Sequence, residues 1–135
     1  MSQTTYKKIL IVEDEPFLLD VYKFAFECAG YQVLTAQSRG KALEIIKTSR
    51  PDLILLDVII PEKEEGLVDY TAKEGFQLLR ELKKDNLKEI PVIVFSNLDY
   101  DHSAESTFKE MNVLDYIIKA NFSPKQLVSR VGQLV

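Results

Sequence analysis

Apolar residues in this chain fall into short unbroken runs, separated by longer segments in which they recur at helical spacing. Unbroken apolar runs predict strands buried on both faces of a parallel sheet. We expect such strands near residues 7–12, 31–35, 53–57, 91–95 and 114–118. A helix is expected after each strand, over 16–29, 38–49, a segment ending near Lys84, 99–111 and 123–134. Strands and helices that alternate in this way predict an α/β fold.

Residues with special backbone preferences stand where these helices are expected to begin and end. Pro16 suits the first turn of a helix, and the pair Ser123-Pro124 suits a cap followed by proline at the first helical position. Gly30 and Asn112 suit the left-handed conformation that follows a helix. These positions support the predicted boundaries.

Several of the apolar runs end on a residue that can bind a metal ion or a phosphoryl group. The first runs into Glu13-Asp14, the third into Asp57, the fourth into Ser96 and the fifth into Lys119. Ligands of an open α/β sheet bind outside the carboxyl ends of its strands. If the strands are neighbours, three carboxylates, a hydroxyl and an amine meet in one crevice. The sequence therefore predicts a site there.

Composition and charge narrow the classes of function. The chain has 135 residues, which fits one domain, and no apolar stretch approaches the roughly 18 residues of a membrane span. The N-terminus has no apolar signal core and Cys28 is the single cysteine, so we expect a cytoplasmic protein. With a net charge of −4 and no long basic run, neither a nucleic acid nor a membrane is an expected direct partner.

Four motifs, taken in order, resemble the receiver domain of two-component response regulators, including the single-domain chemotaxis regulators. They are Val12-Glu13-Asp14-Glu15-Pro16, Asp57-Val58-Ile59-Ile60-Pro61, Ser96 and Asp115-Tyr116-Ile117-Ile118-Lys119. The resemblance implies a flavodoxin-like three-layer sandwich with a parallel sheet of order 2-1-3-4-5 and five helices. It also implies that residues 1–135 form one receiver domain.

By the same resemblance, Asp57 accepts a phosphoryl group from a sensor histidine kinase or a histidine phosphotransfer protein. Clustered carboxylates repel one another unless a cation is present, and Mg²⁺ prefers carboxylate oxygens together with waters. The resemblance makes Asp14 and Asp57 direct ligands of Mg²⁺ and adds the backbone carbonyl of Ile59. Glu13 is expected to act on the metal mainly through water.

The resemblance also assigns the remaining groups of the site. Lys119 and Ser96 are expected to contact the phosphoryl oxygens, and Ser96 and Tyr116 to switch between two arrangements. The chain is then a switch and not a turnover enzyme. Its output is expected through the fourth helix, fifth strand and fifth helix, toward a downstream protein partner. An unphosphorylated scaffold with the same fold is the alternative.

The sequence departs from the family pattern in three places. Residues 62–74 form an insertion before the glycine expected after the phosphoacceptor loop, which we identify as Gly75. The insertion is either neutral or a recognition element. Ala120 follows Lys119 where the family usually has proline, so we expect either a trans bond with a shifted loop or a cis bond. Ile59 and Leu98 replace polar residues that can orient a hydrolytic water, which predicts slow dephosphorylation.

The helix over 16–29 has an apolar arc wider than a one-sided surface helix needs. Either this arc packs against the last helix, or Phe17, Val21 and Phe24 form part of a docking surface for a partner.

Overall fold

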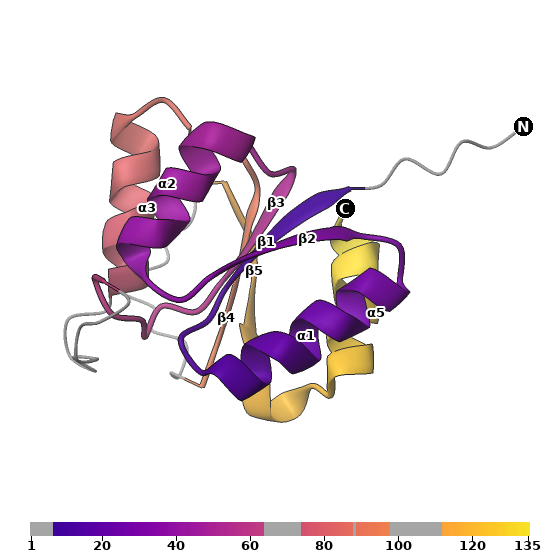
Figure 1. The fold of residues 1–135 in the computed structure, drawn as a ribbon. Helices are drawn as coiled ribbons and strands as arrows, with labels where there is room; N and C mark the ends of the chain where they lie inside the picture. The colour runs from indigo at the N-terminus through magenta and orange to yellow at the C-terminus, as the bar shows by residue number, and fades with distance from the viewer. Residues whose placement is uncertain (1–6, 64–73, 88, 98–111) are drawn as a thin grey trace, which may run out of the picture.

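The computed structural model of the chain describes residues 7–63, 74–87, 89–97 and 112–135. Its centre is a five-stranded parallel sheet of order β2-β1-β3-β4-β5 (Figure 1). The strands are β1 (Lys8–Val12), β2 (Gln32–Ala36), β3 (Leu53–Leu56), β4 (Val92–Ser96) and β5 (Val113–Ile118). These bounds lie within two residues of those predicted from the apolar runs, and the sheet order implied by the resemblance is confirmed.

Helices cover both faces of the sheet and give the molecule three layers (Figure 1). α1 (Pro16–Cys28) and α5 (Pro124–Leu134) lie on one face, and α2 (Arg39–Ser49) and α3 (Glu74–Lys84) on the other. A short 3₁₀ turn, η2 (Lys119–Asn121), connects β5 to α5. The predicted helix over 99–111 lies outside the described residues. None of the described helices is long and apolar enough to cross a membrane.

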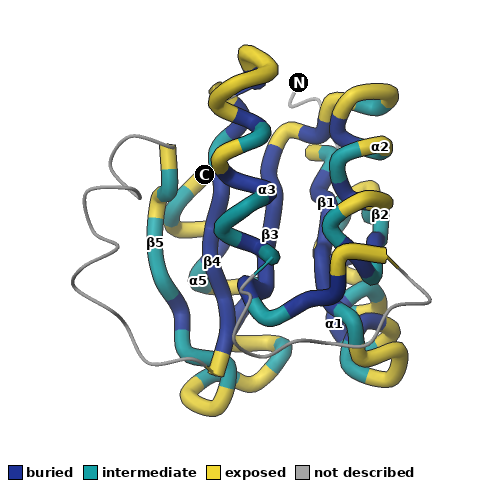
Figure 2. The backbone as a smooth tube through the Cα atoms, turned by 90° about the vertical axis from the view of Figure 1, so that its left-hand side faces the viewer, coloured by how far each residue is buried: buried dark blue, intermediate teal, exposed yellow. Residues whose placement is uncertain are grey.

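Alternate residues of the strands build two separate apolar cores, one on each face of the sheet. In Figure 2 the central strands are dark blue because their residues are buried. Leu10 and Ile54 face α2 and α3, whereas Ile9 and Leu55 face α1 and α5. β1, β3 and β4 are buried at nearly every position because both of their faces are covered. This double burial explains the unbroken apolar runs in the sequence.

Most of the predicted helix ends are confirmed. Pro16 and Pro124 are in the first turns of their helices, and Ser123 caps α5 by accepting a hydrogen bond from the backbone N–H of Gln126. Gly30 has a φ of +95° after α1. Asn112 has the predicted left-handed φ, +53°, but the helix that it is expected to end lies outside the described residues.

The start of α3 lies directly against the loop that follows β3. The backbone N–H of Gly75 donates to the carbonyl of Val58 at 3.0 Å. A Cβ atom at Gly75 would lie only 2.3 Å from Cα of Val58 and 2.8 Å from the carbonyl oxygen of Asp57. The absence of a side chain at Gly75 therefore allows the start of α3 to pack directly against this loop.

Candidate functional site

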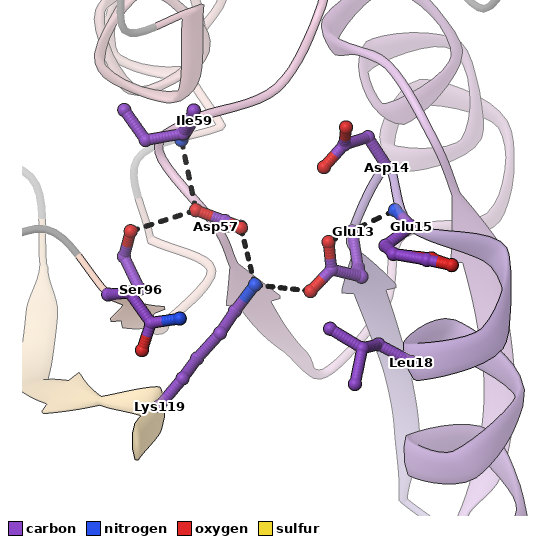
Figure 3. Close-up of a pocket in the computed structure, with 9 residues that line it drawn as sticks. Glu13, Asp14, Glu15, Leu18, Asp57, Ile59, Ser96 and Lys119 are labelled. Carbon is purple, nitrogen blue, oxygen red and sulfur yellow. Dashed lines mark hydrogen bonds and ion pairs between the residues drawn. The ribbon is translucent and has the colours of Figure 1, made fainter. Parts of the chain in front are cut away.

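The predicted residues Glu13, Asp57, Ser96 and Lys119 meet at the carboxyl edge of the sheet (Figure 3). Ser96 is the last residue of β4, and the other three directly follow β1, β3 and β5. Backbone pairing extends one residue past the strands. The N–H of Glu13 donates to the carbonyl of Ala36 and the N–H of Asp57 to the carbonyl of Val12, both at 3.0 Å. The two acidic side chains are thus fixed by the sheet itself.

The Asp57 carboxylate is buried, with 4% of the residue exposed, and both of its oxygens accept hydrogen bonds. Oδ1 accepts from the backbone N–H of Ile59 and from the hydroxyl of Ser96, each at 2.9 Å. Oδ2 accepts from Nζ of Lys119 at 2.6 Å. Donors from three different loops therefore converge on one side chain (Figure 3).

Lys119 bridges the two buried acids. Its ammonium group donates to Glu13 Oε1 as well as to Asp57, and it lies 5.0 Å from the centre of the Phe95 ring. The electron-rich face of an aromatic ring attracts a cation at this distance. Although only 9% of its side chain is exposed, Lys119 has three partners that compensate for lost solvent.

Burial governs the ionisation of the site. Loss of solvent raises the pKa of Glu13 and the pKa of Asp57 above their usual values, and the attraction of Lys119 only partly offsets this. For Lys119, burial alone lowers the pKa, but the charges and hydrogen bonds of Asp57 and Glu13 outweigh it, so its pKa is raised. The two buried carboxylates thus share one positive charge, and Lys119 is the only cation among the described residues that line the pocket.

The donor set fits a hard divalent cation. Glu13, Asp14 and Asp57 each offer a carboxylate oxygen, and these oxygens lie within 4.8 Å of one another. The ion pairs of Lys119 are with Glu13 and Asp57, and none joins it to Asp14 in the described part of the chain. Oxygen ligands around an excess of negative charge are what Mg²⁺ prefers. The residues present therefore fit the expected metal.

Four further residues line the same pocket, namely Glu15, Leu18, Ile59 and Asn97. Glu15 caps α1 by accepting from the N–H of Phe17 at 3.2 Å, and its own N–H donates to Glu13 Oε2 at 3.2 Å. Leu18 and Asn97 are not among the site residues predicted from the sequence. Leu18 belongs to the first helical turn after the acidic pair, and Asn97 directly follows Ser96, so sequence adjacency was the available signal.

The sequence profile of the response regulator receiver domain matches residues 9–132. The chain belongs to this family. The receiver is 36% identical over 127 residues to the phosphate regulon transcriptional regulatory protein PhoB of Pseudomonas aeruginosa, covering 93% of this chain and 50% of that protein. It is 33% identical over 129 residues to a probable transcriptional regulator of Cyanophora paradoxa, covering 96% of this chain and 48% of the relative. The receiver thus spans about half the length of these curated relatives.

Solved structures agree with this assignment. The receiver superposes on the receiver domain of the Francisella response regulator 1452 with a TM-score of 0.75 at 30% identity, covering 95% of each chain. The chemotaxis regulator CheY4 of Vibrio cholerae gives a TM-score of 0.77 at 20% identity, covering 97% of this chain and all of that one, and this likeness shows the fold. Receivers of this family are switches in phosphorelay signalling and not turnover enzymes.

The remaining predictions have mixed outcomes. Tyr116 is half-buried on β5 against the core beneath α2 and α3, and it does not line the pocket of the receiver. The peptide bond between Lys119 and Ala120 is trans, as are all described peptide bonds. Lys119 nevertheless reaches Asp57. The insertion lies mostly outside the described residues, and so does Leu98.

Proposed function

We propose that Asp57 accepts a phosphoryl group from a phosphohistidine of a sensor kinase or phosphotransfer protein. In this reaction one Asp57 oxygen bonds to phosphorus while the bond from phosphorus to the imidazole nitrogen breaks. The observation that carries the proposal is the set of donors already aimed at Asp57. Ser96, Lys119 and the N–H of Ile59 hold the carboxylate before transfer and can donate to the phosphoryl oxygens after it.

The proposal assigns Mg²⁺ to Glu13, Asp14 and Asp57, with the carbonyl of Ile59 as a further ligand. When bound, the ion would supply the missing positive charge against the transferring oxygens. Each residue has a separate task in this arrangement. Glu13 also holds the ammonium of Lys119, so that this amine stays directed at the oxygens of Asp57.

The proposal also includes a docking surface for the phosphodonor protein. We assign the docking of the phosphodonor to the exposed side of α1, where 72% of Phe17 and 69% of Phe24 are open to solvent. This exposure argues against packing of these two rings on α5. Glu15 and Leu18, at the N-terminal end of α1, line the pocket. A donor that reaches Asp57 therefore passes over the start of this helix.

The output part rests on the resemblance. Phosphorylation would shift Ser96 and Tyr116, and with them a face that includes β5 and α5, toward a downstream protein. We assign the receiver, residues 1–135, to the cytoplasm. Ile59 adds no polar side chain to the pocket, so the phosphoryl group should persist, and a half-life of seconds at room temperature would contradict this.

A small phosphodonor tests the proposal without the unknown kinase. Acetyl phosphate with Mg²⁺ should add one phosphoryl group to the wild type, detected as intact mass, and none to Asp57→Asn. Asp52→Asn is the matched control, because Asp52 is an exposed aspartate that accepts from the N–H of Lys8 at the opposite edge of the sheet. It should be phosphorylated like the wild type.

Binding of beryllofluoride, a phosphoryl mimic, provides a second readout. With Mg²⁺, it should shift the amide signals of Tyr116 and of the loops around Asp57 in the wild type only. If neither acetyl phosphate nor beryllofluoride acts on the wild type, the site is inert, and the receiver is an unphosphorylated scaffold.

A further inference from the structure

Asn97 makes a hydrogen bond that joins two loops of the site. Its side-chain Oδ1 accepts from the backbone N–H of Ala120 at 3.0 Å, although the two residues are 23 positions apart in the sequence. Asn97 directly follows Ser96, and Ala120 directly follows Lys119. The loops leave neighbouring strands at the same level, because Ser96 of β4 pairs with Ile118 of β5. One bond therefore connects the segments that carry Ser96 and Lys119.

The N–H of Ala120 needs a partner from outside its own turn. Ala120 lies in the 3₁₀ turn η2, and the first N–H groups of any such turn have no acceptor within it. The residue before the turn, Ile118, has an apolar side chain and makes no capping bond. Asn97 therefore acts as a cap from the adjacent loop, because it accepts the N–H that the residue before a turn usually accepts.

The bond fixes the backbone from which the side chain of Lys119 extends. On the other side, the N–H of Phe122 donates to the carbonyl of Lys119 at 3.2 Å and closes the turn. A lysine side chain is long and flexible, so the place of its amine depends on where its backbone is held. Here the amine must reach both Asp57 and Glu13.

We propose that Asn97 is a positioning residue for phosphoryl transfer, which acts through the backbone of Lys119 and couples that loop to Ser96. This inference rests on the proposed function. Ser96 donates to Oδ1 and Lys119 to Oδ2 of Asp57, so the coupled loops hold the two oxygens of one carboxylate. A displacement of Ser96 toward a phosphoryl group then also displaces the segment that holds Lys119.

The test uses the full chain with acetyl phosphate and Mg²⁺, and it compares three variants. Asn97→Ala removes the acceptor, Asn97→Asp keeps it, and Asn121→Ala removes an exposed amide of the same turn that makes none of the bonds described here. The measurements are made in high salt, about 0.5 M, where the Debye length falls to about 4 Å and screens the charge added by Asn97→Asp.

Asn97→Ala should lower the phosphorylation rate at saturating donor by about three- to tenfold, with KM changed less than about twofold. Its Ala120 amide should exchange with solvent faster, by a similar factor, in the metal-free protein. Asn97→Asp should restore both values, and Asn121→Ala should change neither. In a Lys119→Met background, Asn97→Ala should slow phosphorylation no further, because its effect passes through Lys119.

Several results would overturn the inference. Faster Ala120 exchange with an unchanged phosphorylation rate in Asn97→Ala would make the bond merely structural. A full additional loss in the Lys119→Met background would mean that Asn97 acts on the donor itself. If the wild type is not phosphorylated at all, the proposed function fails and this inference with it. If the wild type is phosphorylated and Asn97→Ala matches it, only the inference fails.

Discussion

At the scale of single residues, Asp57 illustrates a conflict between stability and function. A buried carboxylate whose pKa is raised by burial holds its proton more tightly in the native state than in the unfolded chain. The contribution of Asp57 to the stability of the metal-free protein therefore decreases as the pH rises from the ordinary aspartate pKa of 3.8 toward the raised pKa of the native state. In the proposed phosphoryl transfer the charged form of Asp57 is the reactive one, so the chain would retain for this chemistry a group that its fold disfavours.

We expect Asp57→Asn to be more stable than the metal-free wild type at neutral pH, by about 1–3 kcal/mol, since it removes a buried charge. The difference should shrink toward about pH 4, where the wild-type carboxyl becomes protonated in both states. Urea unfolding in a chelator at several pH values measures it. Mg²⁺ should stabilise the wild type more than the variant. An Asp57→Asn protein that is less stable at every pH would contradict this reasoning.

Gly75 contributes to stability because it has no side chain at a point where the backbone of Val58 is very close. Gly75→Ala would place a methyl group against the backbone of Val58 and Asp57, which cannot rotate away as a side chain can. We expect a loss of about 3 kcal/mol in the free energy of unfolding, measured in urea. Gly132→Ala on α5 is the control. A Cβ atom there meets nothing within 4 Å, so helix propensity should stabilise it by about 0.5–1 kcal/mol. Equal effects of the two variants would exclude the steric explanation.

At the scale of elements, Arg39 joins α2 to both ends of the insertion and to α3. Its guanidinium contacts Glu62 at 3.2 Å, Glu74 at 3.0 Å and also Glu81, with 17% of its side chain exposed. Its backbone N–H donates to the carbonyl of Pro61 at 2.9 Å. A planar group with several donors suits this convergence of carboxylates.

Removing this contact should be costly. We expect Arg39→Met to lower the free energy of unfolding by about 2 kcal/mol, because the partly buried carboxylates of Glu74 and Glu81 and the exposed one of Glu62 lose their shared cation. The matched control is Lys41→Met in the same helix, whose exposed pair with Glu44 should contribute less than about 0.5 kcal/mol. Thermal unfolding of the two variants at equal salt concentration measures the two losses of stability. A loss in Arg39→Met that is no greater than in Lys41→Met would show that the cluster does not stabilise the fold.

The elements and the main site residues could be predicted from the sequence because local patterns encode them. An unbroken apolar run that ends on Asp57 or Lys119 indicates both a strand and the edge where ligands bind. The partners of Arg39 and Asn97 could not be predicted in this way. Arg39 binds glutamates 35 and 42 residues away, and Asn97 binds a backbone N–H, which has no signature in the sequence. These contacts depend on which loops the sheet brings side by side.

At the scale of the whole molecule, the exposed aromatic rings of α1 allow the binding of a donor protein to be tested separately from the transfer reaction. Replacing Phe17 and Phe24 together by serine should slow phosphoryl transfer from a phosphohistidine protein by about tenfold or more, since buried aromatic residues dominate many interfaces. Phosphorylation by acetyl phosphate should not change, because neither ring lines the pocket.

Leu114→Ser is the control for this double variant, because Leu114 is an exposed apolar residue near the start of β5 and far from the carboxyl edge of the sheet. Transfer rates followed with a purified cognate kinase distinguish the outcomes. If the double variant loses its response to both donors, the rings support the fold of the site. If it loses neither, the phosphodonor docks elsewhere.

The ion pairs of Arg39 with Glu62 and Glu74 affect how the sequence of such a receiver can change during evolution. Arg39 holds both ends of the segment between Glu62 and Glu74. Lengthening this segment therefore raises the entropic free-energy cost of closing the loop by only about 0.6 kcal/mol for each doubling of its length. Duplications or acquired segments could therefore accumulate between these glutamates while Asp57, four residues before Pro61, keeps its surroundings. A reporter or recognition module could be inserted at the same place, beside the proposed phosphorylation site.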